Sequence, residues 1–206
     1  MKVLMINGSP RVNGNTSIAL KEMENIFVME GIEVETIQVG NLAVRGCMAC
    51  GGCAKLNRCV FDDCVNEIVE KFKNSDGLVI ASPVYYASAN GTLISVLDRV
   101  FQSGRFDKRM KVGASVVVAR RGGSSATFDE LNKYFTICGM PIASSHYWNS
   151  VHGMTPGEAS KDEEGLQTMR SLAHNMSFLM KSIALGKEKY GLPEVESERK
   201  RTNFIK

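Results

Sequence analysis

The sequence has no apolar run near the ~20 residues that a membrane-spanning helix needs, and no lipid-anchor motif at either end. Its first residues, MKVLMINGSPR, contain too short an apolar stretch, and no cleavage-site pattern, for an export signal. The formal net charge is only +3, and the basic residues are scattered rather than gathered along one stripe. We therefore expect a soluble, cytoplasmic protein that binds neither membrane nor nucleic acid and has no structural disulfides.

The sequence also lacks internal repeats and low-complexity segments, and 206 residues with 44% hydrophobic content suit one α/β domain with a substantial core. Apolar runs of strand length alternate with amphipathic stretches of helix length, which predicts a parallel sheet with helices on both faces. The predicted strands are Lys2–Asn7, Glu33–Val39, Gly77–Ser82, Val112–Ala119 and Pro141–Tyr147. The predicted helices are Thr16–Met29, Val65–Lys73, Thr92–Gln102, Ser125–Ile137 and Asp162–Leu185.

Two segments fall outside this alternation. Residues 41–64 form an insertion far longer than the ~2–6 residues usual between a strand and a helix, and such loops are usually functional. Residues 187–206 are polar and mixed in charge, which is typical of a disordered tail or of an arm on a partner subunit. We expect a domain over residues 1–186 with the insertion, followed by this tail or arm.

The insertion holds four cysteines, Cys47, Cys50, Cys53 and Cys59, in the pattern C-x2-C-x2-C-x5-C. A cage of four thiolates is what an iron–sulfur cubane needs, and close spacing lets one loop wrap most of a cluster. Zinc is less favoured, because structural zinc sites usually separate two C-x2-C knuckles by a dozen or more residues. A metal-free, redox-active thiol loop remains an alternative.

The other two cysteines, Cys64 and Cys138, lie outside this quartet, and Cys138 is most simply a small buried hydrophobic residue. Asp62 and Asp63 are expected to cap the helix that begins near Cys64 rather than to act as acids or bases.

The first predicted strand runs directly into a helix through a loop rich in hydrogen-bond donors. Helix N-termini attract anions, the hydroxyl groups of this loop add donors, and its guanidinium can pair with a phosphate. Neither a G-K-[ST] motif nor G-x-G-x-x-G is present, so a single terminal phosphate fits better than a triphosphate or a dinucleotide. An ordinary capped turn is the alternative. The candidate ligand residues are Ser9, Arg11, Asn15, Thr16 and Ser17.

Two later loops follow predicted strands and reach the same edge of the sheet, where open α/β sheets bind ligands. The first carries two adjacent tyrosines on which a planar ligand could stack, although large amphipathic residues at a sheet edge are common without a ligand. The second offers positive charge and glycines that permit close approach. The candidate cofactor-binding residues here are Pro83, Val84, Tyr85, Tyr86, Asn90, Arg120, Gly122 and Gly123.

Together these residues carry a family resemblance. The loops GSPRVNGNTS and RRGGSS, and the turn SPVYYASANG with the Leu97-Asp98-Arg99 that follows it, resemble those of the flavodoxin-like NAD(P)H-dependent FMN reductases. Within that superfamily, CMACGGCAKLNRCVFDD resembles the cysteine motif of the iron–sulfur flavoproteins. The resemblance implies a doubly wound five-stranded parallel sheet of order 2-1-3-4-5. It also implies FMN held by the three loops and a [4Fe-4S] cluster on the four cysteines.

The resemblance further implies homodimers or tetramers, in which the cysteine loop of one subunit approaches the flavin of another. We expect an FMN-dependent oxidoreductase that passes electrons from NAD(P)H to a small acceptor such as a quinone or free flavin. The flavin carries the chemistry, so we assign no catalytic side chain. One alternative is an electron carrier that receives electrons from a ferredoxin and has no small-molecule substrate. Another is a thiol-based sensor built on the FMN domain.

Overall fold

The computed structural model describes residues 1–196, 198, 200 and 202–204, and contains a five-stranded, fully parallel sheet of order β2-β1-β3-β4-β5. This confirms the predicted fold class and strand order. The strands are β1 (Lys2–Asn7), β2 (Glu33–Gln38), β3 (Gly77–Pro83), β4 (Val112–Ala119) and β5 (Ser150–His152).

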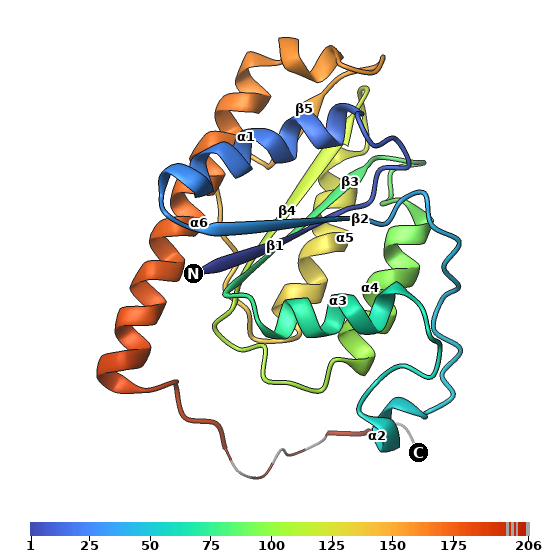
Figure 1. Cartoon of the computed structure of the whole chain (residues 1–206), viewed down its shortest axis with the longest axis vertical. Helices are drawn as coiled ribbons and strands as arrows, with labels where there is room; N and C mark the ends of the chain where they lie inside the picture. The colour runs from blue at the N-terminus through green and yellow to red at the C-terminus, as the bar shows by residue number, and fades with distance from the viewer. Residues whose placement is uncertain (197, 199, 201, 205–206) are drawn as a thin grey trace.

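Helices cover both faces of the sheet, because successive side chains of its central strands point to opposite sides. In β1, Val3 and Met5 join one buried cluster, whereas Leu4 and Ile6 join the other. The first cluster is covered by α1 (Asn15–Met29) and α6 (Glu163–Tyr190), which pack against each other. The second is covered by α3 (Cys64–Lys73), α4 (Gly91–Ser103) and α5 (Ser124–Thr136), as Figure 1 shows.

The fifth strand is not where the sequence predicts it. The predicted segment Pro141–Tyr147 contributes only one isolated bridge, between Gly113 and Ile142, and regular pairing resumes at Ser150. Between them the chain leaves the sheet, and the rings of Tyr147 and Trp148 contact each other at a tilt of 57°, with centroids 5.1 Å apart. Tyr147, the last residue of the predicted strand, and Trp148 after it are more than half exposed, at 58% and 57%.

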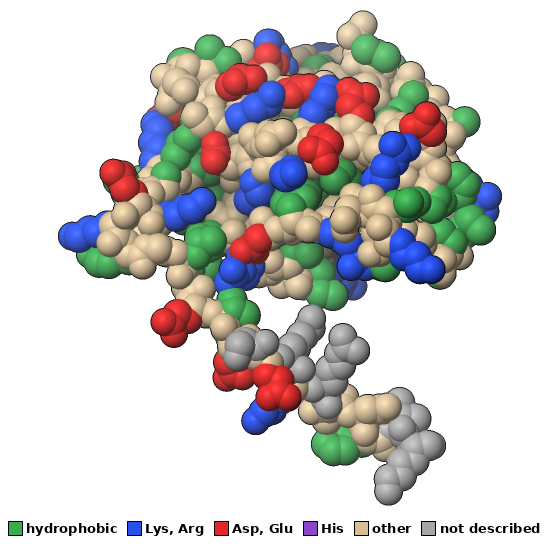
Figure 2. All heavy atoms as spheres, turned by 60° about the horizontal axis from the view of Figure 1, so that its bottom comes forward, with side chains coloured by type: hydrophobic (Ala, Val, Ile, Leu, Met, Phe, Trp, Pro, Cys, Tyr) green, Lys and Arg blue, Asp and Glu red, His purple; other side chains and the backbone are tan. Residues whose placement is uncertain are grey.

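The last helix also differs from its predicted end. α6 continues past Leu185 to Tyr190, beyond the expected domain boundary, and ends at Gly191, whose φ is positive (77°). The chain then leaves the body of the molecule (Figure 2). The division at residue 186 stays a prediction, and residues 197, 199, 201, 205 and 206 of the expected tail lie outside the described residues.

The cysteine-rich insertion follows the carboxyl end of β2. It passes down the outside of the α3 and α4 layer to the short helix α2 (Cys53–Leu56), at the far end of the molecule from the loops that follow the other strands (Figure 1). Within the described residues, no helix has the length and apolar content needed to cross a membrane.

Candidate functional site

A cavity of about 140 Å³ lies at the carboxyl edge of the sheet and is formed by four loops. It brings together most of the residues predicted to bind a cofactor, and adds four that the sequence did not indicate: Gly14, Val118, Gly153 and Met154. The lining residues are Ser9, Arg11, Gly14, Asn15, Thr16, Pro83, Val84, Tyr85, Val118, Arg120, Gly153 and Met154.

The N-terminus of α1 faces this cavity with open hydrogen-bond donors. Gly14 occupies the cap position and supplies no side-chain cap, and the amides of Asn15 and Thr16 find no acceptor in the described chain. Thr16 as a residue is only 2% exposed, and its hydroxyl makes no hydrogen bond to the described residues. Two amides and this hydroxyl at a helix N-terminus suit an anion such as a phosphate.

Other polar side chains of the same loop are used to hold the loop itself. The Ser9 hydroxyl accepts from the Arg11 amide at 3.1 Å and donates to the Arg11 carbonyl at 3.3 Å. The Ser17 hydroxyl donates to the Val12 carbonyl and accepts from the Asn7 side chain. In this structure these hydroxyls therefore shape the loop, and their contact with a cofactor stays a prediction.

Asn15 fastens the loop that follows β5. Its side-chain amide donates to the Thr155 carbonyl at 3.0 Å, and its side-chain oxygen accepts from the Ala159 amide at 3.1 Å. Gly153 lies against it, because a Cβ atom at residue 153 would be 2.7 Å from the Asn15 side-chain nitrogen. The wall of the cavity thus depends on contacts between residues far apart in sequence, which no local pattern displays.

The turn after β3 is unusually constrained. Tyr85 and Ser88 exchange backbone hydrogen bonds at 2.9 and 3.0 Å, and the two residues between them, Tyr86 and Ala87, adopt left-handed φ angles of 51° and 58°. Such angles are costly for residues other than glycine and persist only where the surroundings enforce them. Tyr85 lines the cavity, whereas Tyr86 is fully exposed.

Glu130 of α5 holds this turn, and no local sequence pattern indicated that it would. Its carboxylate accepts from the Ser88 hydroxyl at 2.8 Å and from the Ala89 amide at 2.8 Å. Gly123 presses on the turn from the other side, since a Cβ atom there would be 2.8 Å from the Ala87 Cα. Because Gly123 also has a φ of 93°, only glycine fits this contact without strain.

The remaining predicted residues lie outside the cavity lining. Asn90 is buried and caps α4, its side-chain oxygen accepting from the Leu93 amide at 3.1 Å. Gly122 has open space where a side chain would lie. Their contribution to cofactor binding stays a prediction.

A second cavity, of about 430 Å³, lies between the insertion and the carboxyl-terminal half of α4. All four predicted ligand cysteines line it, and neither Cys64 nor Cys138 does. From α4 it is lined by Asp98, Arg99, Gln102 and Ser103, and from the insertion by Cys47, Met48, Ala49, Cys50, Gly51, Cys53, Cys59, Val60 and Phe61.

The four thiols differ in how firmly they are held. Cys59 is 8% exposed, and Asn66 of α3 fixes its backbone by accepting from its amide at 2.9 Å and donating to its carbonyl at 3.2 Å. Cys47 and Cys50 are exposed, on a loop where Ala49 and Gly51 are left-handed. Among the described residues, no three His, Cys, Asp or Glu side chains lie close enough together to hold a metal ion.

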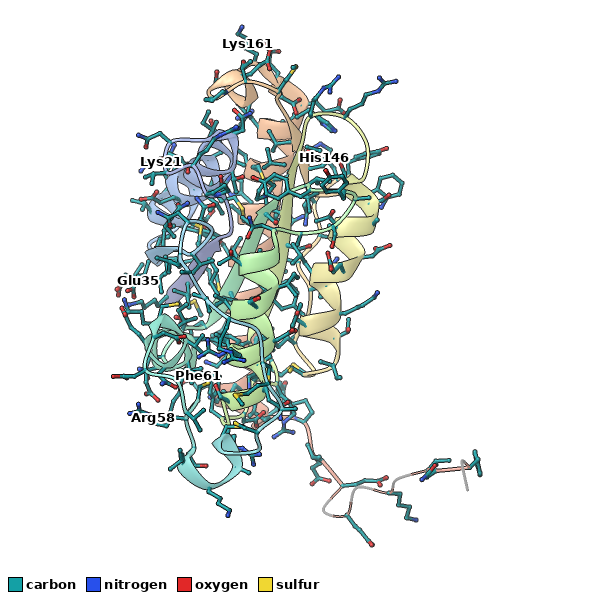
Figure 3. The ribbon with its side chains drawn as sticks, turned by 90° about the vertical axis from the view of Figure 1, so that its right-hand side faces the viewer. Lys21, Glu35, Arg58, Phe61, His146 and Lys161 are labelled. Atoms are coloured by element: carbon teal, nitrogen blue, oxygen red, sulfur yellow. The ribbon has the colours of Figure 1, made fainter. Side chains whose placement is uncertain are left out.

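Arg99 projects from α4 into this region and is 1% exposed. It pairs with Asp63, which also caps α3 as the sequence predicts by accepting from the Val65 amide at 3.2 Å. Burial on its own lowers the pKa of Arg99, but hydrogen bonds to Asp63 and Cys59 more than offset this, so its pKa is raised. The sequence motif contained Arg99 without indicating this role. Figure 3 places the neighbouring Phe61 at the lower end of the molecule, beside α4.

Cys64 and Cys138 behave as ordinary half-buried thiols. Burial, together with nearby Asp63, raises the pKa of Cys64. Burial also raises the pKa of Cys138, although nearby Lys108 acts in the opposite direction. Neither shift favours the thiolate form that binds a metal.

Comparisons with known proteins show the family of the chain. The model of the family described as NADPH-dependent FMN reductase matches residues 1–155. An iron–sulfur flavoprotein of Methanocaldococcus jannaschii is 34% identical over 192 residues, which cover 89% of this chain and 99% of the relative.

Two solved structures show the fold. A flavodoxin from the domain Archaea superposes with a TM-score of 0.60 at 13% identity, covering 88% of this chain and 99% of its own. RosB, with bound 8-demethyl-8-formylriboflavin-5'-phosphate, superposes with a TM-score of 0.69 at 16% identity, covering 100% of this chain and 96% of its own.

Proposed function

The chain belongs to the NADPH-dependent FMN reductase family, in its iron–sulfur flavoprotein branch, and we propose that it is an FMN-dependent oxidoreductase that passes electrons from NAD(P)H to a small acceptor such as a quinone or free flavin. The observation that carries the proposal is the N-terminus of α1. Its unpaired backbone amides lie in the same cavity as Tyr85. A terminal phosphate and a planar ring are the two ends of FMN, and the donors here match one phosphate.

The size of the cavity supports an arrangement in which FMN lies partly in the cavity and partly on the protein surface. Its volume of about 140 Å³ is well below the ~300–1,000 Å³ usual for ligand pockets, so it encloses only part of such a molecule. The phosphate would rest on the amides of Asn15 and Thr16, and the rigid turn at Tyr85 would support the ring. Arg120 lines the same cavity and adds positive charge for an anionic group.

We also propose that Cys47, Cys50, Cys53 and Cys59 hold a [4Fe-4S] cluster. Four thiols on one cavity with a buried guanidinium fit an anionic cluster, and the left-handed residues of the loop let its backbone curl around one. When bound, FMN would supply two-electron chemistry with NAD(P)H, and the cluster would supply one-electron transfer.

The two cavities lie at opposite ends of α4. Asn90, its cap, follows the turn after β3, whereas Gln102 and Ser103 at its other end line the cysteine cavity. Thirteen residues at ~1.5 Å each give about 20 Å of helix between them. This separation favours an assembly in which the insertion of one subunit reaches the flavin cavity of another.

The exposed position of Cys47 and Cys50, far from the flavin cavity, also favours the alternative function. In that case the protein is an electron carrier that receives electrons from a ferredoxin at its insertion, with no small-molecule substrate of its own.

Extraction followed by chromatography is expected to release FMN rather than FAD from the purified protein.

Replacing Thr16 by Val should weaken FMN binding by about 0.5–3 kcal/mol, the upper end applying to a bond with a charged phosphate. Thr168→Val is the matched control, because Thr168 is equally buried at 2% but its hydroxyl donates within α6 to the Glu164 carbonyl. Equal FMN affinity in both variants would show that the Thr16 hydroxyl does not contact the cofactor.

Anaerobically reconstituted protein is expected to contain four iron and four acid-labile sulfide per cluster site, in keeping with a cubane. Cys59→Ala should lose most of this iron, since the best-held ligand is gone, whereas Cys138→Ala should keep it. Iron and sulfide assays measure both, and reconstitution with zinc alone would contradict the cluster.

Steady-state oxidation of NADH and NADPH with a quinone separates the two functions. If the protein is an NAD(P)H-dependent enzyme, it should turn over rapidly with at least one of the two donors. If it is an electron carrier, it should show no turnover with either donor but should be reduced quickly by a ferredoxin under the same anaerobic conditions.

Light scattering is expected to give a dimer or tetramer. The cavity is small and Tyr86 is fully exposed, so a single subunit would leave one face of the flavin ring without protein contacts. A monomer of 22.6 kDa at working concentration would be the contrary result.

A further inference from the structure

The guanidinium of Arg99 donates hydrogen bonds to three residues of the insertion. Its Nε and Nη2 atoms both donate to the Cys59 sulfur, at 3.3 and 3.2 Å. Nη1 and Nη2 donate to the two carboxylate oxygens of Asp63, at 2.7 and 2.9 Å. Nη1 also donates to the Arg45 carbonyl at 3.3 Å, and the guanidinium lies 4.9 Å from the centre of the Phe61 ring.

These contacts tie both ends of the insertion to α4. Arg45 precedes the first cysteine of the quartet, and Cys59 is the last of the four. A buried guanidinium is costly unless it is paired and its donors are satisfied. Asp63 offsets its charge, and Cys59 takes two of its N–H groups.

The most informative contact is that of the Cys59 sulfur, which accepts two hydrogen bonds from Arg99. A neutral thiol is a weak acceptor, whereas a thiolate is an anion that attracts charged donors. Two guanidinium N–H groups directed at one sulfur therefore suit a thiolate bound to iron. In iron–sulfur proteins, hydrogen bonds to the sulfurs and the net charge nearby set the reduction potential.

We propose that Arg99 is a positioning residue for the cluster: its guanidinium holds the Cys59 sulfur at the cavity and raises the reduction potential of the cluster, and Asp63 limits that rise. The inference rests on the proposed function, since it concerns the cluster assigned to the four cysteines. It goes further by assigning opposite electrostatic effects to two residues that are not ligands.

The proposal can be tested because Arg99 and Asp63 should shift the reduction potential of the cluster in opposite directions. Adding an electron to the cluster adds negative charge, which a nearby cation favours and a nearby anion opposes. Arg99→Gln should therefore lower the midpoint potential of the cluster. Asp63→Asn should raise it, because Arg99 then lacks its counter-ion. Asn is as good a helix cap as Asp, so this second variant keeps the start of α3.

Arg58→Gln is the matched control. Arg58 is an arginine of the same insertion, but its side chain is 56% exposed and its partner Asp62 is 96% exposed, so solvent and salt screen its charge. In Figure 3 Arg58 lies at the outside of the insertion. Its replacement should leave the potential unchanged.

The experiment is a redox titration of full-length protein, reconstituted anaerobically and followed by the paramagnetic signal of the reduced cluster, with iron content measured for each variant. We expect the Arg99→Gln and Asp63→Asn proteins to differ in reduced-to-oxidised ratio at a fixed potential by at least about tenfold, which is 59 mV for one electron. Arg99→Lys, which keeps the charge but not the two-pronged geometry, should lie between wild type and Arg99→Gln.

Shifts of the same sign in both variants, or no shift, would overturn the inference while leaving the cluster in place. Should Arg99→Gln lose its iron, the Asp63→Asn variant decides: a raised potential supports the inference, and an unchanged or lowered one overturns it. Wild-type protein that takes up no iron would overturn the proposed cluster and this inference together.

Discussion

A parallel sheet brings the carboxyl ends of all its strands to one edge, and the rest of this molecule is arranged around that constraint. The loops after β1, β4 and β5 and the turn after β3 meet there, and together they form a small cavity. The insertion after β2 is the exception, because it leaves this edge and passes along the outside of the helical layer. A segment that far from the sheet needs another support, which Arg99 of α4 and Asn66 of α3 supply.

The parts of the fold that were predicted from the sequence are those that local patterns determine. β1, β3 and β4 are buried apolar runs whose length and composition indicate strands, and the four closely spaced cysteines line one cavity. The fifth strand was predicted at the wrong residues, because the exposed aromatic residue Tyr147 has the same strand propensity as a buried one.

The candidate site was predicted less completely, for a related reason. A sequence shows which side chains can donate hydrogen bonds, but not whether a distant part of the chain already uses them. Asn15 is engaged by the loop after β5, and Glu130 reaches the turn after β3 from another helix. Arg99 was visible as part of a motif, but its pairing with Cys59 and Asp63 depends on how α4 packs against the insertion.

The left-handed turn at Tyr86 and Ala87 has a consequence for the thermodynamics of cofactor binding. Glu130 and Gly123 fix this turn in the protein alone, through contacts that require no ligand. Loops that become ordered only on binding lose conformational entropy at that moment, and affinity falls accordingly. Here the entropy of the turn is lost during folding, so a ring that docked on it would meet a surface that needs no further ordering.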